Sequence, residues 1–197
     1  MADPLYLSLW FRDFDREEML PHALSVMRQF PFSTAKQGIH YLSLHPVSWD
    51  EATVLEERFR PGITPEAAIL IASDLLHDDY AYVFEAYWDL WLFSEEKKEW
   101  ALQPSLVQFL VHGVDFDRGI GEQEGNIELD FGLDSAFLQE ELQLTLEGEE
   151  HVRANVQKLV EFVTAVEKNA GISSRLLWSE SEENLAQKLI SRLQKVQ

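Results

Sequence analysis

The sequence predicts an α+β protein with a mixed, mostly antiparallel sheet and helices packed on one face of it. Segments whose apolar residues recur with a period of two, typical of strands, alternate with segments whose period is near 3.6, typical of helices. Hydrophobic residues make up 46% of the 197 residues and charged residues 26%, a balance typical of folded globular proteins. We expect one domain over residues 1–197, which two similar halves, 1–113 and 114–197, could build.

The first part of the chain reads as strand, helix, strand and helix. Residues 5–12 alternate between apolar and polar side chains, which predicts a strand. Residues 15–30 open with a capping pair and continue as an amphipathic helix. A second strand follows at 38–47. The segment 48–59 opens with another capping pair, which predicts a short helix that ends near Phe59.

A long hairpin is expected in the middle of the chain. Pro61-Gly62 indicates a break, and Thr64 with Pro65 predicts the start of a helix that runs to about residue 77. Residues 80–93 then alternate with a period of two and carry two central carboxylates, which favours a strand over a membrane helix. A polar connection at 94–99 leads to the partner strand at 100–113.

The last third repeats the order of the first. A strand at 126–133, a helix at 149–169, a strand at 174–179 and a helix at 179–196 follow one another. This order matches that of residues 5–59, which favours two ferredoxin-like halves, although chance similarity is the alternative. In that arrangement the hairpin at 80–113 is an insertion or a shared edge, and the acidic strands leave one sheet face open.

The negative charge is concentrated in the middle of the chain. The formal net charge is −19, and residues 62–150 hold 21 acidic residues against three basic ones. Proteins that bind nucleic acids or anionic membranes need a basic patch, and the sequence has only a weak basic bias in its last predicted helix. We therefore expect neither nucleic acid nor membrane as a partner. A basic protein or a cationic ligand fits the charge, as does a surface that is merely hydrated.

Three features of the sequence predict a cytoplasmic location. The chain has no cysteine, no apolar run of eighteen residues and no basic signal-peptide start. Whether the protein forms homo-oligomers is left open.

Carboxylates and aromatic rings along the predicted hairpin and its neighbour form a candidate ligand- or partner-binding face. The candidate residues are Glu85, Tyr87, Asp89, Trp91, His112, Glu128 and Asp130. They share one sheet face if the strands at 80–93, 100–113 and 126–133 are adjacent. Ring faces attract cations, so this face suits a sugar or a cationic ligand, with Trp91 as an exposed anchor. The alternative is a half-exposed face with hydrated acids.

Hydrolytic chemistry on the same face needs two carboxylates at a suitable separation. Glu85 and Asp89 lie about 13 Å apart along a strand, too far for the two carboxylates of a glycosidase. Only a cross-strand pair such as Glu85 with Asp130 could fill that role.

A metal site is a second hypothesis, at the loop 115–125. Asp115 and Asp117 occupy positions one and three of a calcium loop, but Ile120 replaces the required glycine and Asn126 the final glutamate. The loop is therefore no EF-hand. A looser site for Ca²⁺ or Mg²⁺ at the two aspartates, or a simple polar loop, stays open.

Other catalytic motifs are missing from the sequence. The histidines lack the spacing of a zinc protease, and there is no nucleophile elbow and no P-loop. We therefore favour a non-enzymatic cytoplasmic binding or adaptor protein that presents an acidic, aromatic sheet face to a basic protein segment or a cationic ligand. The alternatives are a carboxylate-based hydrolase, with or without a divalent metal, and a self-associating structural protein.

Overall fold

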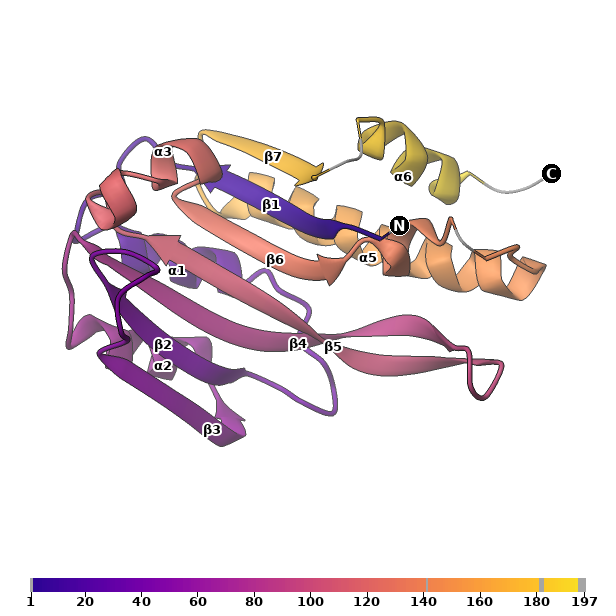
Figure 1. Ribbon diagram of the computed structural model, residues 1–197, viewed down its shortest axis with the longest axis horizontal. Helices are drawn as coiled ribbons and strands as arrows, with labels where there is room; N and C mark the ends of the chain where they lie inside the picture. The colour runs from indigo at the N-terminus through magenta and orange to yellow at the C-terminus, as the bar shows by residue number, and fades with distance from the viewer. Residues whose placement is uncertain (1, 141, 181–182, 195–197) are drawn as a thin grey trace.

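One antiparallel sheet forms the centre of the computed structural model, which describes residues 2–140, 142–180 and 183–194. Across these residues its strand order is β3-β2-β4-β5-β6-β1-β7 (Figure 1). The strands are β1 (Pro4–Trp10), β2 (Ile39–Pro46), β3 (Leu55–Ile63), β4 (Tyr80–Ser94), β5 (Glu99–His112), β6 (Ile127–Leu133) and β7 (Ser174–Ser179). The β4–β5 hairpin lies at the centre of the sheet and projects beyond the other strands at its turn.

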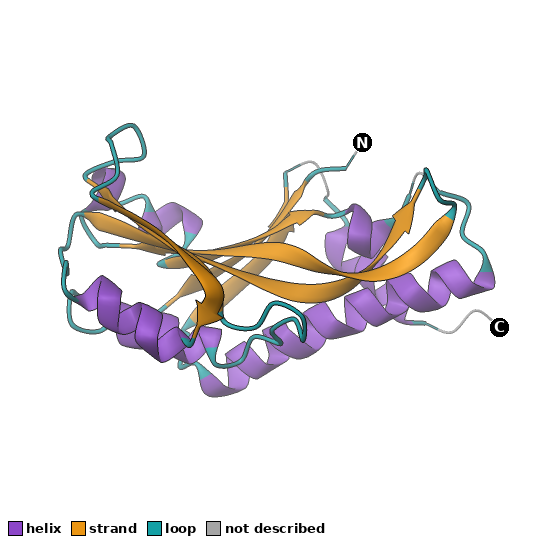
Figure 2. Ribbon diagram, turned by 90° about the horizontal axis from the view of Figure 1, so that it is seen from below, coloured by secondary structure: helices purple, strands orange, loops and turns teal. Residues whose placement is uncertain are grey.

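The principal helices lie on one face of the sheet, and the long helix α5 runs beneath it (Figure 2). The helices are α1 (Met19–Met27), α2 (Pro65–Ser73), α3 (Gly121–Glu124), α4 (Ser135–Leu138), α5 (Leu146–Asn169) and α6 (Leu185–Leu193), with a 3-10 turn η1 (Phe116–Arg118). The α+β prediction, with helices on one face, is therefore confirmed.

The alternation of apolar side chains in the strands builds the core beneath the sheet. In β4 the even-numbered residues face the helices, and Tyr82, Phe84 and Trp88 are fully buried there. One continuous cluster of buried side chains extends from Leu5 to Leu189. The two proposed halves of the chain thus share a single hydrophobic core.

The ferredoxin-like halves are not confirmed. In the first half, β1 pairs with β6 and β7, whereas β2 pairs with β3 and β4. Three strands therefore separate β1 from β2, although helix α1 directly connects them. The β4–β5 hairpin joins the two sides of the sheet and is neither an insertion nor an edge.

The helix predicted at 48–59 is wrong. Residues 55–63 form strand β3, and the predicted break at Pro61-Gly62 lies inside that strand. Arg58 and Arg60 are exposed on either side of the buried Phe59, so the true period of the segment is two. The capping spacing that suggested a helix belongs to the turn that precedes β3.

The start of α2 and the region of the last helix were predicted more closely. Thr64 caps α2, and its hydroxyl oxygen accepts a hydrogen bond from the amide of Ala67 at 3.2 Å. The last helix was expected at 179–196. The structure begins α6 at Leu185, and residues 181–182 and 195–196 of the expected range lie outside the described residues.

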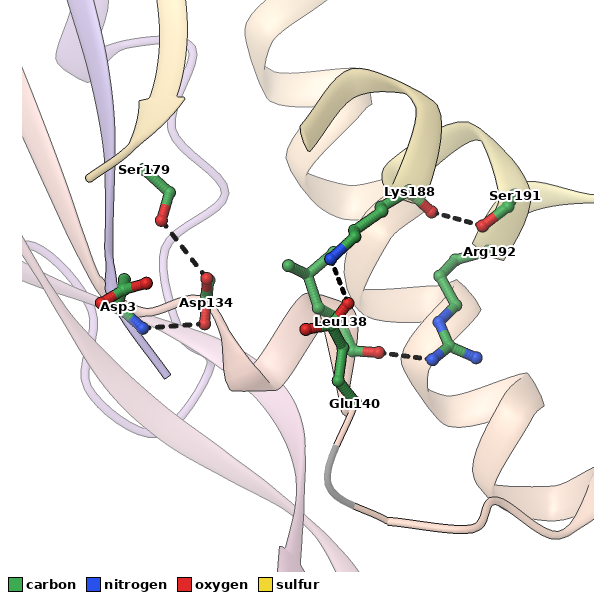
Figure 3. Close-up of polar contacts among 8 residues, drawn as sticks. All are labelled: Asp3, Asp134, Leu138, Glu140, Ser179, Lys188, Ser191 and Arg192. Atoms are coloured by element: carbon green, nitrogen blue, oxygen red, sulfur yellow. Dashed lines mark hydrogen bonds and ion pairs between the residues drawn. The ribbon is translucent and has the colours of Figure 1, made fainter. Parts of the chain in front are cut away.

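Polar contacts fasten the C-terminal segments to the end of the sheet (Figure 3). The buried carboxylate of Asp134 accepts hydrogen bonds from the Asp3 amide at 3.2 Å and from the Ser179 hydroxyl at 3.3 Å. It therefore joins the loop after β6 to the start of β1 and the end of β7. Helix α6 is held separately: Lys188 pairs with Glu140, and Arg192 donates to the Leu138 carbonyl at 2.6 Å.

We expect Asp134→Ala to lower the free energy of unfolding by about 1–2 kcal/mol, because the half-buried Asp3 amide and the buried Ser179 hydroxyl lose their acceptor. Asp134→Asn keeps one acceptor oxygen, so its free energy of unfolding should fall by less than half as much. Urea unfolding of both variants measures the difference. Equal losses in the two variants would show that the negative charge, and not the pair of hydrogen bonds, holds this corner.

Candidate binding face

The sheet face opposite α1, α2 and α5, here called the open face, carries most of the candidate residues. Directly paired residues of antiparallel strands point to the same face, so the strand register defines rows of neighbouring side chains. One row crosses all seven strands and consists of Arg58, Tyr41, Glu85, Gln108, Asp130, Tyr6 and Trp178. The next row consists of Glu56, Ser43, Val83, Leu110, Glu128, Ser8 and Leu176.

These rows place the predicted carboxylates in two separate surroundings. Glu128 and Asp130 lie two residues apart on β6 and point to the open face together. Glu85 lies on β4, two strands from Asp130, and Gln108 of β5 stands between them. Two strand spacings correspond to about 9.5 Å between Cα atoms. The structure therefore does not bring Glu85 and Asp130 together as a close pair.

Two other candidates, Asp89 and Trp91, lie on β4 beyond the stretch that pairs with β2. The pairing of β4 with β2 ends at Ala86, and a loop and helix α5 take over that edge of β4. The Asp89 carboxylate accepts a hydrogen bond from the Thr34 amide at 3.1 Å. The Trp91 ring stacks on His151 of α5, with 3.9 Å between ring centroids. Both side chains fasten β4 to its neighbours, and Trp91 is not an exposed anchor.

Glu128 is the most unusual carboxylate of the open face. It is only 7% exposed and forms no hydrogen bond or ion pair with a described residue. Burial, together with the nearby charges of Glu124 and Asp130, raises its pKa to about 7. Asp130, in contrast, accepts a hydrogen bond from the Gly132 amide at 2.8 Å.

Aromatic rings border these carboxylates on the side of β1 and β7. The rings of Tyr6 and Trp178 lie 4.7 Å apart, and the indole nitrogen of Trp178 donates to the Ser8 hydroxyl at 3.0 Å. Burial raises the pKa of Tyr6, as do the charges of Asp130 and Glu128. We call the group of Tyr6, Glu124, Glu128, Asp130 and Trp178 the acidic–aromatic patch.

Tyr6, Glu124 and Trp178 were absent from the predicted set of site residues. The alternation of residues 5–12 did place Tyr6 on the polar side of its strand, but its neighbours depend on the strand order. The pairing of β1 with both β6 and β7 brings Tyr6 and Trp178 beside Asp130. That order joins the two ends of the chain, and local sequence patterns carry no signal for it.

His112 lies at the end of the open face, beneath a neighbouring loop. It is 1% exposed, and the Trp49 ring lies 5.9 Å from its own. Its Nδ1 donates to the Gly125 carbonyl at 2.8 Å, so Nε2 is the unprotonated nitrogen, and this atom has no hydrogen-bond partner in the described residues. Burial lowers the pKa of His112 and favours this neutral form.

The predicted metal loop forms the turn η1 and the residues around it. The amide of Asp115 donates to the Asp78 carbonyl at 2.9 Å, and the amide of Asp117 donates to the Val47 carbonyl at 2.8 Å. Within residues 2–140, 142–180 and 183–194, no group of three or more histidine, aspartate or glutamate side chains is arranged to hold a metal ion. The geometry therefore adds no ligand to the two aspartates.

Comparison of the chain with models of protein families, with characterised proteins and with solved structures gives no match. Among the described helices, none is both long and apolar enough to cross a bilayer.

Proposed function

We propose that this protein is a non-enzymatic binding protein whose acidic–aromatic patch takes up a basic protein segment. The observation that supports this proposal is that the nearly buried Glu128, which has no polar partner among the described residues, lies with Asp130 beside the Tyr6 and Trp178 rings. An arginine or lysine side chain placed there would meet carboxylates and ring faces at once. Both interactions favour a cation.

The energetics of Glu128 also favour a cationic partner. An ionised carboxylate in a poorly hydrated position is destabilised, which is why the pKa of Glu128 is raised to about 7. A cation that binds beside it removes part of this cost and lowers that pKa. Binding should therefore strengthen as the pH rises through 7, because the ionised form of Glu128 attracts the partner.

The first test measures the binding of a fluorescent arginine–glycine peptide by anisotropy at low and high salt. We expect binding that weakens with added salt and that falls at least about tenfold in the variant Glu124→Gln, Glu128→Gln, Asp130→Asn. The control variant Glu96→Gln, Glu99→Gln, Glu150→Gln removes the same charge from exposed acids elsewhere. If peptide binding weakened equally in both variants, the loss would follow from net charge alone, and the proposed patch would be refuted.

A carboxylate-based hydrolase is the second candidate, and the pKa of Glu128 is the observation that favours it. A carboxyl group with a pKa of about 7 suits a general acid, and Asp130 lies two strand residues away, about 6.7 Å along the chain. This spacing lies near the lower limit for inverting glycosidases, about 6.5–9.5 Å. Release of nitrophenol from nitrophenyl glycosides, lost in Glu128→Gln, would favour the enzyme. No release by the wild-type protein would favour the binding protein.

A further inference from the structure

A cavity at the β3 end of the open face differs in charge from the rest of the protein. It has a volume of about 580 Å³, within the usual range of small-molecule sites, about 300–1,000 Å³. The loop 34–37 forms one wall and residues 58–62 of β3 form the other. Glu85 and Tyr87 of β4 line it between these walls.

Three cationic side chains line this cavity: Lys36, Arg58 and Arg60. Glu85 is the one carboxylate among the lining residues, so the lining is positively charged in a chain whose net charge is −19. None of the three cations forms an ion pair with a described residue. Lys36 instead lies over the Tyr87 ring, 4.4 Å from its centroid, and Arg58 lies 5.0 Å from that of Tyr41.

Two acids near these cations accept hydrogen bonds from neutral donors. Gln108 donates a side-chain hydrogen bond to Glu85 at 2.9 Å, and the Tyr41 hydroxyl donates to Glu56 at 3.1 Å. These two carboxylates therefore form no ion pair with Lys36, Arg58 or Arg60. The three cations are exposed and line an open cavity, and their side chains donate no hydrogen bond to a described residue.

The two walls of the cavity are in direct contact at Gly62. A Cβ atom at this position would lie 2.3 Å from the Gln37 carbonyl oxygen, so only glycine permits this approach of β3 to the loop. Nε2 of His40 donates to the same carbonyl at 3.1 Å. The spacing between the loop that carries Lys36 and the strand that carries Arg58 and Arg60 is therefore fixed before any ligand arrives.

We propose that this cavity binds the phosphate monoester of a small organic molecule. Arginine side chains offer paired N–H groups that match phosphate oxygens, and lysine adds a point charge. Three cations against one carboxylate favour a doubly negative group over a singly negative one. The volume exceeds what a phosphate group needs, so the organic part of the ligand would lie beside Tyr87 and Pro61.

The test uses phenyl phosphate as the probe and titrates it into the intact protein by calorimetry, with phenyl sulfate as the singly charged analogue. We expect saturable binding of phenyl phosphate and at least about tenfold weaker binding of phenyl sulfate. The variant Arg58→Gln, Arg60→Gln should bind phenyl phosphate at least about tenfold more weakly. The control variant Lys97→Gln, Lys168→Gln removes two positive charges elsewhere and should bind it as the wild type does.

Three results would overturn the assignment: no binding of phenyl phosphate by the wild type, equal affinity for phenyl sulfate, or equal losses in the two variants. Circular dichroism of each variant verifies that the fold is intact, which is expected because both arginines are exposed. The outcome is separate from that for the acidic–aromatic patch. The variant Glu124→Gln, Glu128→Gln, Asp130→Asn leaves every lining residue of the cavity unchanged and should retain phenyl phosphate binding.

Discussion

Replacing Glu128 by glutamine should stabilise the folded protein at pH 8 by about 3 kcal/mol and by less than about 1 kcal/mol at pH 5. The pKa of Glu128 is raised from its ordinary value of 4.5 to about 7 in the folded protein. The folded state therefore holds this proton more tightly than the unfolded state. The resulting stability is fully present below pH 4.5 and is lost as the pH rises through 7. Glutamine never ionises, so the variant avoids that loss.

Urea unfolding of wild type and variant at both pH values measures this effect, since each pKa unit corresponds to about 1.4 kcal/mol. Glu122→Gln, which removes an exposed acid from the nearby helix α3, controls for the change in net charge. A Glu128→Gln variant with the same relative stability at pH 5 and pH 8 would contradict the burial-raised pKa. It would also remove the main physical argument for a cation-binding patch at this residue.

A stabilising substitution at this nearly buried carboxylate would itself indicate function. Glutamine at position 128 keeps the size of the side chain and would suit the sheet better at neutral pH. A residue that costs stability and has no partner within the described structure is typical of a site selected for binding or catalysis. The peptide-binding and nitrophenyl glycoside experiments distinguish these two uses.

Local patterns of the sequence predict the elements of this fold well where the alternation of apolar residues continues over many positions. The alternation at 80–93 and 100–113 gives β4 and β5 nearly to the residue, and Thr64 with Pro65 gives the start of α2. The segment 48–59 was misread because its capping spacing favours a helix, whereas the alternation of Arg58, Phe59 and Arg60 decides for a strand. Pairing with β2 outweighs the local preference in this segment.

The sites depend on strand order, which the local sequence does not determine. Glu128 and Asp130 were predicted to share a face, and they do so because they are two residues apart on one strand. Their aromatic neighbours Tyr6 and Trp178 come from opposite ends of the chain. The cationic cavity was missed for the same reason: Lys36 precedes β2, and Arg58 and Arg60 lie on β3, so no basic run marks them in the sequence.

Asn155 should be the polar side chain whose loss is most destabilising, because it closes the free edge of β4 against α5. Its side-chain oxygen accepts from the Trp91 amide at 2.8 Å, and its amide donates to the carbonyls of Trp91 and Ala136, each at 2.8 Å. Asn155 is 2% exposed, so water cannot replace these bonds without an opening of the interface. We expect Asn155→Ala to lower the free energy of unfolding by about 3–4 kcal/mol, since three backbone groups lose their partner.

Asn155→Asp provides the matched comparison, because it keeps the oxygen that accepts from Trp91 but turns a donor into an acceptor. At pH 8 the new carboxylate would face the carbonyl oxygens of Trp91 and Ala136. The free energy of unfolding of Asn155→Asp should therefore fall at least as much as that of Asn155→Ala. Below the pKa of the new carboxyl group, its proton can donate to one of these carbonyls and part of the stability should return. A loss below about 1 kcal/mol in Asn155→Ala would mean that other contacts of α5 hold this edge, namely the Trp91–His151 stacking and the hydrogen bond from Lys158 to the Asp89 carbonyl. The hairpin would then be fastened to α5 by these contacts and not by Asn155.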